Sequence, residues 1–103
     1  MDLSSNKIGD LGGCDLAAML QYNQSLQFLS LKNNSMQEQT GEVLTNFLKA
    51  NTTLLDLDVT FNDFNYKHIS QIERKIKENM KMYKAAAIDR YKKGKKENPE
   101  NIL

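Results

Sequence analysis

The chain has 103 residues, a length for one domain, and its net charge of +1 gives it no general affinity for polyanions. Cys14 is the only cysteine, which excludes an internal disulfide and favours a reducing, intracellular setting. No segment approaches the roughly 18 consecutive apolar residues of a membrane span. The first residues already follow the repeat described below, so we expect no signal peptide.

Charge is unevenly distributed along the chain. Residues 1–66 contain three Lys/Arg and eight Asp/Glu, a net of −5, whereas residues 67–103 contain eleven and five, a net of +6. An acidic first part followed by a basic second part indicates a tail that is used for interaction.

Apolar residues recur along the chain with a period of 28 residues. Each apolar column takes one residue from each of three successive units. The main columns are Met1, Leu29 and Leu57; Leu3, Leu31 and Val59; Leu16, Leu44 and Ile72; and Leu20, Leu48 and Ile76. A fixed period of this length predicts a solenoid, in which each unit buries its apolar face against its neighbours.

Each unit combines a strand with a helix. Alternation of apolar and polar residues predicts short parallel strands over 1–3, 29–31 and 57–59. Apolar spacings of three and four predict amphipathic helices around Leu16–Leu20 and Val43–Leu48. Asn23 and Asn51 follow these two helices, where a left-handed Asn would close the last turn.

Two further positions of the repeat carry no large apolar residue in the first two units. Asn6, Asn34 and Asn62 follow the strands, and a stacked column of inward Asn side chains is predicted to satisfy backbone groups at the turn. Gly13 and Gly41 share one repeat position, and we expect the missing side chain to let each helix approach the sheet closely.

The third unit departs from this pattern because its helix does not stop. Ile69 replaces the glycine, and neither Pro nor Gly occurs over 66–93 while apolar spacings of three and four continue. The first half of this helix is expected to cap the last repeat, which would otherwise expose core and an open sheet edge. The predicted divisions are repeats over 1–82, the last unit acting as the cap, a projecting basic continuation over 83–93, and a flexible tail over 94–103.

Residues 3–20, LSSNKIGDLGGCDLAAML, and residues 29–34, LSLKNN, resemble the ribonuclease-inhibitor-like class of leucine-rich repeat. The resemblance covers about residues 1–82. It implies an α/β solenoid with parallel strands on the concave side and helices on the convex side. Met1 already occupies a strand position, so we expect the chain to be the C-terminal portion of a longer repeat protein. Upstream repeats or a partner would then cover its N-terminal face.

The sequence gives no basis for catalysis, and we expect no enzyme, metal or cofactor. His68 is the only histidine, and a nucleophile would have to lie beside it. Cys14 is two units away, roughly 10 Å at a strand spacing of about 4.8 Å. One His and one Cys cannot build a four-ligand metal site, and the Gly12-Gly13 pair lacks the lysine and the spacing of a phosphate-binding loop.

The outward positions of the strands form the first candidate binding surface. If the Leu residues of each strand point into the core, their neighbours face solvent on the concave side. The candidate partner-binding residues there are Phe28, Ser30, Lys32, Asp56, Asp58 and Phe61. An outward Phe is a plausible anchor for a protein partner. Cover by an upstream loop for Phe28, and packing under the Asn turn or the cap helix for Phe61, are the alternatives.

The second candidate surface is the continuation of the long helix. Tyr83 and Tyr91 form an apolar stripe with Ala87, and Lys92 and Lys93 flank it. A stripe that outlasts its own core, projecting roughly 16 Å, predicts a partner helix or groove. Folding back along the repeats is the alternative. The basic run itself could contact acidic protein, nucleic acid or anionic lipid, or remain a solvated tail.

These features predict a non-enzymatic scaffold or adaptor that binds protein partners. We expect it to be a structural part of a larger assembly, intracellular and cytoplasmic, with a cytoskeletal or ciliary setting. The alternative is a regulator of a small GTPase or other enzyme that acts through the concave face. Nucleic acid and membrane are not the expected partners.

Overall fold

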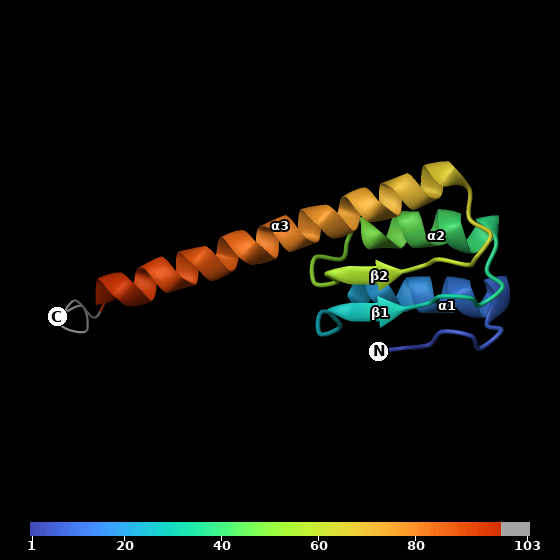
Figure 1. Cartoon of the computed structure of the whole chain (residues 1–103), viewed down its shortest axis with the longest axis horizontal. Coiled ribbons are helices and arrows are strands. Elements are labelled where there is room, and N and C mark those ends of the chain that lie inside the picture. The colour runs from blue at the N-terminus through green and yellow to red at the C-terminus, as the bar shows by residue number, and fades with distance from the viewer. Residues whose placement is uncertain (98–103) are drawn as a thin grey trace.

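The computed structural model describes residues 1–97 and places three helices and two strands in that range (Figure 1). In chain order these are α1 (Gly9–Tyr22), β1 (Phe28–Ser30), α2 (Glu38–Leu48), β2 (Asp56–Asp58) and α3 (Tyr66–Glu97). The strands form one layer and the helices lie behind them, with α1 packed on α2 and α2 on α3. Strand, helix and strand alternate as the sequence predicts.

The two strands form a small parallel sheet. In its register Phe28 pairs with Asp56, Leu29 with Leu57, and Ser30 with Asp58. The predicted strands are thus confirmed in the second and third units, each beginning one residue earlier than expected. In the first unit the strand is reduced to a single parallel bridge between Asp2 and Ser30.

The Asn column at the end of the strands is confirmed. Asn34 is fully buried, and its Nδ2 donates to the carbonyls of Leu3 and Leu31 at 2.8 and 3.0 Å. Its Oδ1 accepts from the backbone amide of Asn6 at 2.8 Å, and the Oδ1 of Asn62 accepts from that of Asn34 at 3.0 Å. The side-chain amides therefore link each strand-to-helix turn to the preceding one, because donor and acceptor are both used.

The Asn residues that follow the first two helices do not act as predicted. Asn23 is extended (φ −76°, ψ 124°) and Asn51 has no positive φ, so the left-handed cap is wrong. Instead, the Oδ1 of Asn51 accepts from the amides of Thr53 and Leu54, which turns the chain toward β2. The equivalent Asn79 lies inside α3, and its buried Oδ1 has no partner in the described structure.

The glycines let helices approach one another, not the sheet. A Cβ on Gly13 would lie 2.5 Å from the Oγ1 of Thr40 on α2, and one on Gly41 would lie 3.1 Å from the Nδ1 of His68 on α3. The expectation of close helix-to-sheet contact is therefore wrong, since the space is filled by the next helix of the stack.

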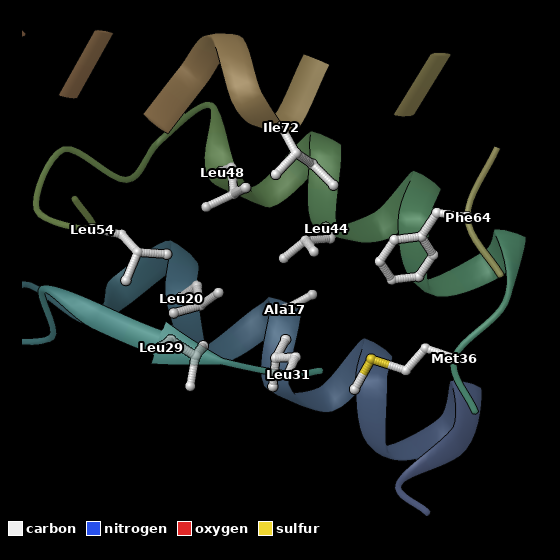
Figure 2. Close-up of a cluster of buried hydrophobic side chains, with 10 residues drawn as sticks. All are labelled: Ala17, Leu20, Leu29, Leu31, Met36, Leu44, Leu48, Leu54, Phe64 and Ile72. Atoms are coloured by element: carbon white, nitrogen blue, oxygen red, sulfur yellow. The ribbon is translucent and has the colours of Figure 1, made fainter. Parts of the chain in front are cut away.

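The core lies between the strands and the helices and runs through all three units (Figure 2). Its buried apolar side chains include at least one residue from each of the four main predicted columns. They are Ala17, Leu20, Leu29, Leu31, Met36, Leu44, Leu48, Leu54, Phe64 and Ile72. At about 1.5–3 kcal/mol for each fully buried large side chain, this shared core is the main stabilising term.

The last helix, α3, leaves the repeats after its first half. It packs on α2 near its start and then projects away from the sheet, giving the molecule a longest dimension of 57 Å. The helix continues through Gly94 to Glu97, beyond the end predicted at residue 93. The remainder of the predicted tail, 98–103, lies outside the described residues.

Candidate functional site

The structure gathers the predicted concave residues on one face of the sheet. Phe28 lies beside Asp56, and Ser30 lies beside Asp58, in the register of the two strands. Phe28 is 54% exposed, as expected for an outward strand position. We call Phe28, Ser30, Lys32, Asp56, Asp58 and Phe61 the strand-face patch.

The carboxylates on this face are held by the turn that follows each strand. The Oδ1 of Asp58 accepts from the hydroxyl of Thr60 at 2.6 Å and from its backbone amide at 3.0 Å. Asp2 accepts from Ser4 in the same way. These hydroxyl and amide bonds hold the pKa of both carboxyls below the usual range, so both stay negatively charged to a lower pH than a free Asp does.

Phe61 is held outward by a backbone conformation that the repeat imposes. Its φ is +57°, and Ser5 and Asn33 at the same repeat position have φ values of 59° and 57°. Asn tolerates this left-handed conformation, whereas an aromatic residue there is strained. Phe61 is 75% exposed, so the alternative of packing under the turn or the helix is wrong.

One contact crosses the patch between units. The Nζ of Lys32 lies 5.1 Å from the centroid of the Phe61 ring, within the range of a cation–π interaction. The ammonium also lowers the pKa of Asp58, as a smaller contribution than the Thr60 hydrogen bonds. An exposed ring, a lysine and a carboxylate therefore occupy neighbouring positions on one surface.

The second candidate surface is the helix extension, residues 83–94 of α3. Tyr83 is 46% exposed and Tyr91 is also exposed, and the extension projects instead of folding back on the repeats. Sequence reasoning missed Ile88, which is 56% exposed. Its position three residues before Tyr91 was the available signal, since such residues share a helix face.

Basic side chains surround this apolar surface. Lys92 and Lys93 are exposed as predicted, and Lys93 pairs with Asp89 at 3.5 Å across one helical turn. Such an exposed pair contributes little, about 0.3–0.5 kcal/mol. The far end of α3 lies away from both strands, so the helix extension and the strand-face patch are two separate surfaces (Figure 1).

The histidine and the cysteine lie on different helices of the stack. His68 is in the first turn of α3, where its Nδ1 is buried against Gly41 and has no hydrogen-bond partner in the described structure. Cys14 is half-buried in α1. Over residues 1–97, no three His, Cys, Asp or Glu side chains are grouped as metal ligands would be, and no described helix is long and apolar enough to span a membrane.

The comparisons with known proteins agree with the repeat geometry. The family model described as "Leucine Rich repeat" matches residues 1–17 and 50–67, each of which contains a strand-to-helix turn with its Asn. No curated protein matches the chain. The family match and the α/β arrangement with a small parallel sheet support a leucine-rich-repeat protein. Domains of this class generally mediate protein–protein interaction and are typically non-enzymatic.

Proposed function

We propose that this protein is a non-enzymatic scaffold in a larger assembly, and that its helix extension is the surface that binds the partner. The observation that carries the proposal is the exposure of Tyr83 and Ile88 on a helix that has left its own core. Apolar side chains exposed on a helix beyond the fold are typical of a helix that docks with a partner.

The charge of the extension defines the partner. Exposed cations, with Asp89 as the one acidic residue over 81–94, flank the apolar residues. They are Lys81, Lys84, Arg90, Lys92 and Lys93. Two copies of such a helix would repel each other, whereas an acidic amphipathic helix or groove would complement it. The proposed partner is therefore an acidic protein surface with an apolar strip.

The architecture of the proposal follows the resemblance found in the sequence. The units form part of a solenoid of the ribonuclease-inhibitor-like class, and the first half of α3 caps the helical layer of the last unit. Upstream repeats or a partner cover the N-terminal face. A stiff helix at the end of a repeat stack suits a structural component, and we place the protein in the cytoplasm, within a cytoskeletal or ciliary assembly.

A paired-variant binding experiment tests the proposal. The intact chain, a Tyr83→Glu/Ile88→Glu variant and a Phe28→Ala/Phe61→Ala variant are immobilised and exposed to cell extract at low and moderate salt. The helix variant should lose the partner while the strand-face variant keeps it, since the helix substitutions lie beyond the repeats. Unfolding curves check that both variants remain folded. Retention of the partner by the helix variant would contradict the proposal.

The strand-face patch favours a second candidate function, regulation of a small GTPase or another enzyme. Its specific support is the contiguous placement of Phe28, Asp56, Lys32, Asp58 and Phe61 on the outer face of the sheet. Replacing Phe28, Asp56 and Asp58 should then abolish the regulatory effect. Those changes should leave binding through the helix extension intact.

A further inference from the structure

The sheet ends at β2 with an edge that no described segment covers, so the expectation that the first half of α3 covers this edge is wrong. Within the stack, the amide of Leu3 donates to Ser30 at 2.9 Å, and that of Leu31 donates to Asp58 at 2.8 Å. The corresponding amide in the third unit belongs to Val59, and no backbone group of the described chain accepts from it. The carbonyl of Leu57 occupies the repeat position of the Met1 carbonyl, which accepts from the amide of Ser30. No backbone amide of the described chain donates to the Leu57 carbonyl in this way.

A groove of about 450 Å³ lies between this edge and α3. Its apolar lining consists of Leu57, Val59, Ile69, Ile72 and Ile76. Leu57 and Val59 are half-buried, whereas their column mates, Leu29 in β1 and Leu31 directly after it, are buried. The groove is therefore the site that a further strand would occupy if the repeats continued.

The interior of the same molecule shows what fits such a groove. β1 is covered by a parallel strand that places an apolar residue at every second position, Leu57 and then Val59. The free amide of Val59 and the carbonyl of Leu57, two residues apart on one edge, match the hydrogen-bonding pattern of an added parallel strand. An extended segment with alternating apolar residues meets both requirements.

The rim of the groove selects the charge of that segment. Asp56, Asp58 and Glu73 line it, against the single cation of Lys77. Within the stack, Lys32 follows two residues after Ser30, which pairs with Asp58. Its ammonium lowers the pKa of the Asp58 carboxyl as a smaller contribution than the Thr60 hydrogen bonds. A segment with Lys or Arg at its outward positions would repeat this arrangement.

We propose that the groove between β2 and α3 binds an extended, basic segment of another protein by strand addition. Apolar side chains at alternate positions enter the groove, and the backbone pairs with Val59 and Leu57. The proposal uses a surface separate from the helix extension, so each can fail without the other.

A synthetic peptide tests this inference. The probe is a fluorescein-labelled Lys-Leu-Lys-Leu-Lys-Asn peptide, titrated into the intact chain and followed by anisotropy. We expect saturable binding, weakened at least about tenfold by Val59→Pro, which removes the free amide at an edge position where Pro is tolerated. Glu73→Lys should weaken it similarly, whereas Glu42→Lys, an exposed acidic residue on α2, is the matched control and should leave it unchanged.

Three results would overturn the inference. The first is absence of saturable binding up to roughly millimolar peptide, or binding by the Val59→Pro and Glu73→Lys variants that is as tight as binding by the unsubstituted chain. The second is self-association of the intact chain that Val59→Pro abolishes, which would make a second copy the occupant. The third is slow exchange of the Val59 amide in the isolated chain, which would mean that a segment of the chain itself covers the edge.

Discussion

Asn6 and Asn34 occupy the same repeat position but differ in the number of hydrogen bonds they make. The side chain of Asn34 is buried and bonds to four backbone groups, whereas that of Asn6 is exposed and bonds to two carbonyls. Asn34→Ala should lower the free energy of unfolding by about 2–4 kcal/mol, because it leaves buried groups unpaired, and Asn6→Ala by about 1 kcal/mol or less. Urea unfolding measures both. Equal losses would contradict this account.

Asp10 stabilises the helix of the next unit. Its carboxylate accepts from the Thr40 hydroxyl and from the amides of Gln37 and Thr40, and these bonds hold its pKa below the usual range. A lowered folded-state pKa gives stability that is present above the unfolded pKa and is lost as the pH falls through the folded one. Asp10→Ala should therefore cost about 1 kcal/mol at neutral pH and progressively less below about pH 4.

Unfolding of the wild type and of Asp10→Ala at several pH values measures this difference. Asp15→Ala, at an exposed position on α1, is the control and should show a small cost at every pH. A cost for Asp10→Ala that does not change with pH would exclude the carboxylate as its source.

Phe61 combines exposure with a strained backbone. Because Asn33 holds the same left-handed conformation one unit earlier, Phe61→Asn should raise the free energy of unfolding by about 1 kcal/mol. If the strand-face patch binds a partner, the same substitution should weaken that binding by about 2 kcal/mol, as loss of an aromatic anchor does. Thermal unfolding and a binding titration together separate the two effects. Destabilisation by Asn would show that the ring contributes packing.

At the scale of the element, substitution of two helical glycines by Ala should have opposite effects on helix stability. Gly13→Ala places a methyl group against Thr40 and should destabilise the α1–α2 packing by about 1–3 kcal/mol. Gly94 has open space around its Cβ position, so Gly94→Ala should increase helicity at the end of α3. Ala in a helix is more favourable than Gly by about 1 kcal/mol of free energy. Circular dichroism with thermal unfolding checks both. A stable Gly13→Ala variant would mean that the helices can separate without cost.

The sequence predicts the elements well where a side-chain type has one structural use. The 28-residue period places Leu29 against Leu57 and stacks Asn34 on Asn62, because burial and amide pairing repeat with the backbone. The sequence predicts less where the structure around a residue depends on contacts with another element. The partner of Gly13 is a residue on the next helix, which local spacing does not identify.

The candidate surfaces were predictable to different degrees. Strand alternation is sufficient to predict that Phe28 points outward. The exposure of Phe61 follows from a left-handed backbone conformation in the turn, which the alternation does not predict. On the helix extension, a single stripe of spacing includes Tyr83 and Tyr91 and omits Ile88, which flanks it. Whether α3 projects or folds back depends on packing, which periodicity alone cannot decide.

At the scale of the whole molecule, the helix extension should be independent of the folded body. Its residues lie beyond the core, so a chain ending at Met82 should unfold with a free energy within about 0.5 kcal/mol of the full chain. Amides over 83–94 should exchange rapidly, whereas those of β1 and α2 should exchange at the rate of global unfolding. Hydrogen-exchange mass spectrometry measures both. Slow exchange over 83–94 would reveal a packed extension.

The hydrogen bond between the Asp10 carboxylate on α1 and the start of α2 has a consequence for how the chain folds. Gln37 gives α2 no side-chain cap of its own, and the carboxylate that replaces it belongs to Asp10, one unit earlier. α3 has its own cap in Asn65, whose Oδ1 accepts from the amide of His68 and whose Nδ2 donates to Glu38 on α2. The start of α2 is therefore ordered by a residue of α1, and the cap of α3 is held by a residue of α2. We expect the three helices to become ordered together, because each helix start is tied to the preceding unit.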